Sequence, residues 1–229
     1  MPASIGPAAG AMRLAAGTAA YAAVLFVVAG TVAWPAAWAY LVTITAVMIV
    51  YGAVVMRLHP ELIEERRNPP AGAKSWDRPF VVIVGLIGPA AFLLLSGLDH
   101  RFRWSAPSPP WLQAAGVVGV AAGGMLANWA VAANRFFSSV VRIQRDRGHQ
   151  VVDAGPYRYI RHPGYAGSMF NMVGVSFALG SRVALVVAVL LCLVLAVRTA
   201  LEDRTLHDEL DGYAEYARRV RFRLIPGVW

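Results

Sequence analysis

Residues 14–56 read LAAGTAAYAAVLFVVAGTVAWPAAWAYLVTITAVMIVYGAVVM, without a charged side chain. An uncharged run of about 20 residues is long enough to cross the hydrocarbon of a bilayer as a helix. The pair Trp34-Pro35 divides the stretch into two such runs, Leu14–Ala33 and Ala36–Met56. The sequence therefore predicts a transmembrane helical hairpin. The first run is too long for the apolar part of a signal peptide, so we expect it to stay as an anchor.

The rest of the chain continues this pattern. Two further uncharged runs, Phe80–Leu98 and Trp111–Ala133, predict a third and a fourth span. The apolar region 165–197 is too long for one crossing, and a turn at Gly180-Ser181 would divide it into two helices, the first of them short. Because 58% of the 229 residues are hydrophobic and only 15% are charged, lipid is expected to be part of the solvent. We predict an all-α, polytopic integral membrane protein with about six spans.

The basic residues predict the orientation. Of the 21 Lys and Arg residues, one lies at residue 13, five in 57–78, six in 134–161 and six in 198–229, all on one side of the six-span arrangement. The other side receives only Arg101, Arg103 and Arg182. Basic residues accumulate in cytoplasmic loops, so both termini and the loops 57–79 and 134–161 are expected in the cytoplasm. The net charge of +8 is explained by these loops rather than by nucleic-acid binding.

Several site classes find no support in the sequence. The single cysteine, Cys192, lies in an apolar run and is interpreted as a packing residue, which leaves no disulfide framework. The five histidines have no pair spacing typical of a zinc site. The spacing Gly119-x-x-x-Gly123 lies inside an apolar run without a preceding strand, so it indicates close helix packing rather than a nucleotide loop.

The stretch Gly155-Pro-Tyr-Arg-Tyr-Ile-Arg-His-Pro-Gly-Tyr165 is the most informative polar segment. Gly155-Pro156 predicts a turn, and Pro163 suits the first position of a helix, with His162 just before it. The free N–H groups of such a helix terminus can bind a carboxylate or a phosphate. A loop that only guides the chain into the membrane explains the segment equally well.

Two later stretches also combine charge with apolar surface. Arg198 and Glu202 are four residues apart and share a helix face where the last span leaves the membrane. They form either an interfacial ion pair or part of a site, because ionisable groups at such depth usually serve function. In the tail from Tyr213 to residue 229, basic and apolar residues alternate over residues 221–224, which favours binding to anionic lipid or, alternatively, a lid over a pocket. In the loop before the third span, Glu61 and Glu65 are interpreted as members of a solvated helix on the membrane surface.

Together these stretches resemble the isoprenylcysteine carboxyl methyltransferase family of integral membrane enzymes. The resemblance rests on residues 155–165 with Gly167, on Arg198-x-x-x-Glu202-Asp203 and on Tyr213-x-x-Tyr216, and it covers the chain from about Asn134 to the C-terminus. It implies four N-terminal spans in residues 1–133 and a catalytic region in residues 134–229. The segments 60–66 and 134–138 look like features of the family's bacterial and archaeal branches.

The resemblance also implies a cytoplasmic pocket for S-adenosylmethionine. Arg198 and Glu202 would be catalytic, and the residues expected at the cofactor are Tyr157, Arg161, His162, Pro163, Tyr165, Glu202, Asp203, Tyr213 and Tyr216. Asp203 stands where the family usually has a second glutamate, and Leu210-Asp211-Gly212 replaces its more usual Phe-Gly.

Three functions are compatible with these observations. The first is S-adenosylmethionine-dependent methyl transfer to a lipophilic acceptor from the bilayer, such as the carboxylate of an isoprenylated cysteine. The second is NADPH-dependent reduction of a sterol or isoprenoid double bond, because membrane sterol reductases share an Arg-His-Pro-x-Tyr element and an Ile-Pro-Gly tail like that of residues 225–227. The third is a non-catalytic protein that binds membrane lipids or a partner. The sequence favours the first and leaves the oligomeric state open.

Overall fold

A computed structural model describes residues 7–67 and 72–229, and within them every regular element is helical. Residues 68–71 of the predicted loop 57–79 lie outside the described residues. The helices are α1 (Pro7–Ala29), α2 (Pro35–Leu58), α3 (Glu61–Arg67), α4 (Arg78–Val82), α5 (Gly88–Phe102), α6 (Pro110–Ala133), α7 (Pro163–Ala178), α8 (Arg182–Glu209) and α9 (Tyr213–Arg219). A π-helical turn, Ile83–Ile87, joins α4 to α5, and 3₁₀ turns cover Ser75–Asp77, Arg145–Arg147 and Gly155–Arg158.

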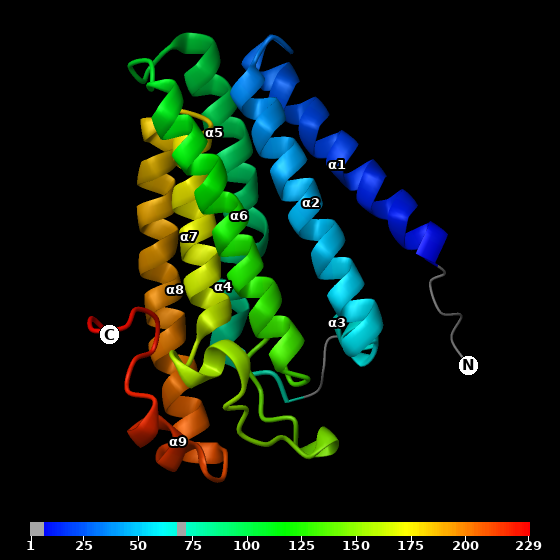
Figure 1. Cartoon of the computed structure of the whole chain (residues 1–229), viewed down its shortest axis with the longest axis vertical. Helices are drawn as coiled ribbons and strands as arrows, with labels where there is room; N and C mark the ends of the chain where they lie inside the picture. The colour runs from blue at the N-terminus through cyan, green and yellow to red at the C-terminus, as the bar shows by residue number, and fades with distance from the viewer. Residues whose placement is uncertain (1–6, 68–71) are drawn as a thin grey trace.

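Within residues 7–67 and 72–229, five helical segments are long and apolar enough to cross a membrane. They are Gly10–Ala29, Pro35–Leu58, Ser75–Phe102, Pro110–Ala133 and Arg182–Glu209. The predicted division of region 165–197 is confirmed, because α7 ends at Ala178 and α8 begins at Arg182. With 16 residues, α7 is only about 24 Å long and is shorter than the hydrocarbon core. It lies between α6 and α8 (Figure 1), so protein surrounds much of its surface.

The packing of α6 against α7 is the most extensive between any two helices. A Cβ atom on Gly116 would lie 2.1 Å from the backbone nitrogen of Ala178, and one on Gly123 would lie 2.5 Å from the carbonyl oxygen of Gly167. Only glycine allows the two backbones to approach so closely. The prediction that the glycines of residues 116–124 serve helix packing is confirmed, and the contact fixes α7 relative to the rest of the bundle.

The polar loops gather at one end of the bundle. Figure 1 shows α3, α9 and the loop between α6 and α7 at the same end, with the short connections after α1, α5 and α7 at the other. Direct contacts join the loops: the Lys74 N–H donates to the carbonyl of Val141 over 2.9 Å, and the Arg161 N–H donates to the carbonyl of Phe222 over 2.9 Å. The prediction that the two long loops and the C-terminal region share one side is therefore confirmed.

Candidate active site

The segment before α7 forms the turn and helix start expected from its sequence. Residues 155–158 form a 3₁₀ turn, His162 caps α7, and Pro163 is the first residue of the helix. The N–H of His162 is bonded to the carbonyl of Arg223 over 2.9 Å, so the C-terminal segment lies directly against this segment. Of the two interpretations of the tail, this contact favours a cover over the site.

A single buried carboxylate, Asp203, ties three parts of the chain together. Its two oxygens accept from Arg161 Nε and Nη2 over 2.8 and 3.0 Å, and Arg223 Nε donates to it over 2.8 Å. The Tyr213 hydroxyl donates over 2.9 Å, and His162 Nε2 lies 3.3 Å away. With 1% of its surface exposed, Asp203 is balanced by two guanidinium groups rather than by water. Its bonds hold the α7 start, α8 and the tail in one arrangement.

Glu202 and Tyr165 form the second polar contact of the site. The Tyr165 hydroxyl donates to Glu202 Oε2 over 2.5 Å, which joins the first turn of α7 to α8. The guanidinium carbon of Arg198 lies 5.3 Å from the centre of the Tyr165 ring. A cation at this distance from an aromatic ring is attracted to it, so Arg198 helps to hold Tyr165 in place.

Arg198 is bound by a residue that the sequence interpretation missed. Its Nε and Nη2 donate to the two carboxylate oxygens of Asp77 over 2.7 and 2.9 Å, and Nη2 also donates to the carbonyl of Ser139 over 3.0 Å. Asp77 precedes α4, 121 residues away, and is 1% exposed. Of the two interpretations of Arg198, the ion pair with Glu202 is not found among the described contacts. The guanidinium fork is bound to Asp77 instead, whose carboxylate matches its two parallel donors. A lone aspartate before a span gave no signal of this role.

A cavity of about 110 Å³ brings most of the candidate residues together. Its wall includes seven of the ten: Tyr157, Arg161, His162, Tyr165, Glu202, Tyr213 and Tyr216. Pro163, Arg198 and Asp203 do not contribute to the wall and lie behind it. The remaining wall comes largely from the loop between α6 and α7, including Phe136, Ser138, Arg142, Gln144 and His149. Among the described residues, no group of three or more His, Cys, Asp or Glu is placed to hold a metal ion.

Three tyrosines give the cavity an aromatic lining. Burial raises the pKa of Tyr157, Tyr213 and Tyr216 above the usual value of a phenol, so all three are neutral at pH 7. The Tyr216 hydroxyl donates to the Tyr157 carbonyl over 2.8 Å, which fixes α9 against the 3₁₀ turn. These three residues therefore present neutral aromatic rings to a ligand.

Part of the chain is similar to a known family of methyltransferases. Residues 116–208 match the model of the isoprenylcysteine carboxyl methyltransferase (ICMT) family. Over these residues, about two fifths of the chain, the protein is similar to the ICMT family. The matched region runs from α6 to the end of α8 and contains every candidate site residue except Tyr213 and Tyr216.

Curated relatives named as protein-S-isoprenylcysteine O-methyltransferases match about two fifths to one half of the chain. A protein-S-isoprenylcysteine O-methyltransferase B of Arabidopsis thaliana is 31% identical over 113 residues, 48% of this chain and 57% of that protein. A protein-S-isoprenylcysteine O-methyltransferase of Schizosaccharomyces pombe is 32% identical over 92 residues, 39% of each chain. A probable enzyme of the same name from Oryza sativa subsp. indica is 29% identical over 116 residues, 50% of this chain and 58% of that protein. The matches thus span about half the length of these ICMT relatives.

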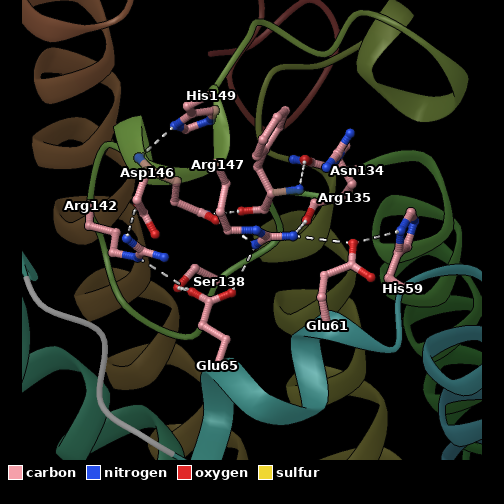
Figure 2. Close-up of polar contacts among 12 residues, drawn as sticks. His59, Glu61, Glu65, Asn134, Arg135, Ser138, Arg142, Asp146, Arg147 and His149 are labelled. Atoms are coloured by element: carbon pink, nitrogen blue, oxygen red, sulfur yellow. Dashed lines mark hydrogen bonds and ion pairs between the residues drawn. The ribbon is translucent and has the colours of Figure 1, made fainter.

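The acidic helix α3 lies outside the region matched to the ICMT family, yet it contacts the cavity wall. Figure 2 shows Arg147 between Glu61 and Glu65, with Nη1 bonded to Glu65 over 3.3 Å and Nη2 to Glu61 over 3.2 Å. Glu65 also accepts from the Ser138 hydroxyl over 2.6 Å, and its side chain is only 7% exposed. The interpretation of α3 as a solvated helix is therefore wrong for Glu65. Its partners lie more than 70 residues away, where helical spacing cannot identify them.

Proposed function

We propose that this protein is an S-adenosylmethionine-dependent methyltransferase whose acceptor is the carboxylate of an isoprenylated cysteine or a similar amphiphile. The observation that carries the proposal is the cavity in which His162, Tyr165 and Glu202 meet, inside the region that matches the ICMT family. The names of the curated relatives agree with this chemistry. Neither comparison favours a reductase or a non-catalytic role.

The wall of the cavity suits this cofactor. Among the described residues of the wall, Glu202 is the only carboxylate. The Tyr165 hydroxyl fixes its orientation, so it would attract a sulfonium cation. Tyr157, Tyr213 and Tyr216 would pack against the adenosine part. Ligand pockets usually have volumes of about 300–1,000 Å³, so the walls of the present cavity must separate to admit the cofactor. Helix α9, which contributes Tyr213 and Tyr216 to the wall, lies at the end of the bundle (Figure 1).

Little acid–base chemistry is required of the protein. Bound S-adenosylmethionine would supply an electrophilic methyl group, and a carboxylate acceptor is already nucleophilic at pH 7. The chain then has to align the two and exclude water. We propose that Arg198 acts through Tyr165, as a positioning residue held by Asp77, because it does not reach the cavity wall. With a thiol, phenol or amine acceptor, Glu202 would be the candidate base.

A second cavity offers space for a lipid chain. It has a volume of about 420 Å³ and lies among α1, α2, α5, α7 and α8, with a lining that is mostly apolar and includes Tyr21, Tyr40, Asn171 and Leu191. Asn171 is six residues beyond Tyr165 on α7, about 9 Å along the helix axis, so the cavity lies deeper in the bundle than the candidate site. A lipophilic acceptor could place its chain there while its polar end reaches Glu202.

We propose that the site faces the cytoplasm of the cell that makes the protein, because the end of the bundle that holds it also holds most of the basic residues. Two single-cysteine variants, Arg145→Cys and Arg103→Cys, each made in a Cys192→Ser background, test this orientation. A membrane-impermeant maleimide should label the Arg103→Cys variant in intact cells and the Arg145→Cys variant only after the cells are opened. Labelling of the Arg145→Cys variant in intact cells would reverse the proposed orientation.

Binding measurements on the detergent-purified protein test the function itself. Titration calorimetry should show binding of S-adenosylhomocysteine and none of NADPH, and radioactive methyl groups should pass from S-adenosylmethionine to N-acetyl-S-farnesylcysteine. His162→Ala and Tyr165→Ala should weaken S-adenosylhomocysteine binding in a protein that remains folded. NADPH binding without S-adenosylhomocysteine binding would favour the reductase, and binding of neither would leave the non-catalytic role.

A further inference from the structure

Arg142 is the least satisfied cation in the wall of the candidate site. Its side chain is only 6% exposed, and it forms a single hydrogen bond, from Nη1 to Asp146 over 2.9 Å, with the described residues. Nε is buried without a hydrogen-bond partner among them and lies 3.6 Å from Glu65 Oε1. A guanidinium has five N–H donors, so most of its hydrogen-bonding capacity remains unused.

Arg161, the other arginine of the wall, shows the contrast. All three of its nitrogens are bonded: Nε and Nη2 to Asp203, and Nη1 to the carbonyls of Val220 and Arg221. Arg161 therefore has few free N–H donors left to bind a ligand. Because buried N–H groups without partners are rare in folded proteins, the free donors of Arg142 point to a partner that is not among the described residues.

The two carboxylates beside Arg142 do not use all of its N–H donors. Asp146 is 63% exposed, so water screens most of its charge. Glu65 is buried, but it also accepts from Ser138 and from Arg147. Figure 2 shows Glu65 and Asp146 contacting Arg142 from two sides, which fixes the guanidinium against the loop between α6 and α7. Arg142 is thus a positioned, buried cation that still has free donors.

We infer that Arg142 binds the carboxylate of a ligand in this cavity, and that Glu65 positions it for this purpose. The inference rests on the proposed function, in which two molecules bring a carboxylate: the cofactor in its amino-acid part and the acceptor in its cysteine. The wall then offers Glu202 to a cation and Arg142 to an anion, which complements a ligand that carries both charges. It also gives the acidic helix α3 a role in the site.

Binding to paired ligands that differ in one carboxylate tests the inference. S-adenosylhomocysteine is compared with 5′-methylthioadenosine, which lacks the amino-acid part, by calorimetry on the detergent-purified full chain. Arg142→Gln should weaken S-adenosylhomocysteine binding about 10- to 100-fold, the value of one or two charge-assisted hydrogen bonds. The affinity for methylthioadenosine should stay unchanged. This outcome assigns the carboxylate to the cofactor.

The second arm addresses the acceptor. If Arg142→Gln leaves S-adenosylhomocysteine binding unchanged but raises the KM for N-acetyl-S-farnesylcysteine by the same factor, the carboxylate belongs to the acceptor. Inhibition by the corresponding carboxamide should then be equal in both proteins. Arg145→Gln is the matched control, because it removes the same charge from an exposed position in the same loop. It should change neither quantity.

Arg142→Lys keeps the charge beside Glu65 and Asp146 and secures the test if the glutamine variant does not fold. Lysine lacks the planar fork, so it should reproduce the loss in part. Affinity and KM that equal those of the unmodified protein, in folded Arg142 variants, would overturn the inference and leave the proposed function intact. Absence of S-adenosylhomocysteine binding in the unmodified protein would instead overturn the proposed function, and this inference with it.

Discussion

The Asp77→Asn substitution removes the charge to which Arg198 is bound. Asp77 accepts two hydrogen bonds from Arg198, over 2.7 and 2.9 Å, and a third from the Val141 N–H over 2.8 Å. The side chains of Arg198 and Asp77 are only 9% and 1% exposed, so water cannot replace the lost acceptor. Leaving a buried charge uncompensated costs about 3–5 kcal/mol. We therefore expect the free energy of unfolding to fall by that amount.

Denaturation in mixed micelles, with increasing amounts of dodecyl sulfate, measures this loss. Asp153→Asn is the control, because its ion pair with Arg219 has both side chains 61% exposed and should contribute only about 0–1 kcal/mol. Removal of both partners, in Asp77→Asn with Arg198→Met, should cost clearly less than the sum of the single changes. If Asp77→Asn lowers the free energy of unfolding by less than about 1 kcal/mol, the ion pair does not hold α8 against the segment that precedes α4.

Three further changes follow from the site and from the helix packing. Tyr165→Phe removes the donor to Glu202, and we expect kcat for methyl transfer to fall about 10-fold or more while the protein remains folded; an unchanged kcat would separate Glu202 from the reaction. Gly123→Ala inserts a Cβ into the backbone of α7 and should lower stability by about 1–3 kcal/mol, whereas Gly52→Ala, with open space around it, should not; equal stability of the two variants would contradict the close packing. Burial, with Arg142 and Arg147 nearby, lowers the pKa of His149 to about 4 from its usual 6.5. The unfolded chain binds the proton first, so stability should fall as pH decreases from about 6.5 to 4, and His149→Gln should flatten that part of the profile of melting temperature against pH.

The sequence was sufficient where one segment decides its own structure. The apolar runs predicted the long helices, and Pro163 after His162 predicted the start of α7 to the residue. The glycines around Gly123 predicted close packing, because only the absence of a side chain explains them inside an apolar helix. In each case the physical requirement is local, so the spacing of residues contains it.

The contacts of the site depend on partners that spacing cannot reveal. Arg198 has Glu202 within one helical turn, yet its guanidinium is bound to Asp77 from another helix. Glu65 belongs to a helix whose charged composition is typical of a protein surface. Its side chain is buried only because the loop between α6 and α7 folds over it. In both cases the sequence identified a charged residue, and the tertiary structure decided which charge it meets.

The position of Asp77 has a consequence for the making of the protein. It is separated from Arg198 by 121 residues, which at about 5–20 residues per second take roughly 6–24 s to synthesise. During that time the carboxylate enters the membrane region without its guanidinium. Asp77 lies at the third residue of the span Ser75–Phe102, where water at the membrane surface can solvate it. If the same pair lay at the centre of the bilayer, the carboxylate would be an unpaired charge in hydrocarbon until α8 was synthesised. Because the pair lies near the membrane surface, the span that contains Asp77 can be inserted before α8.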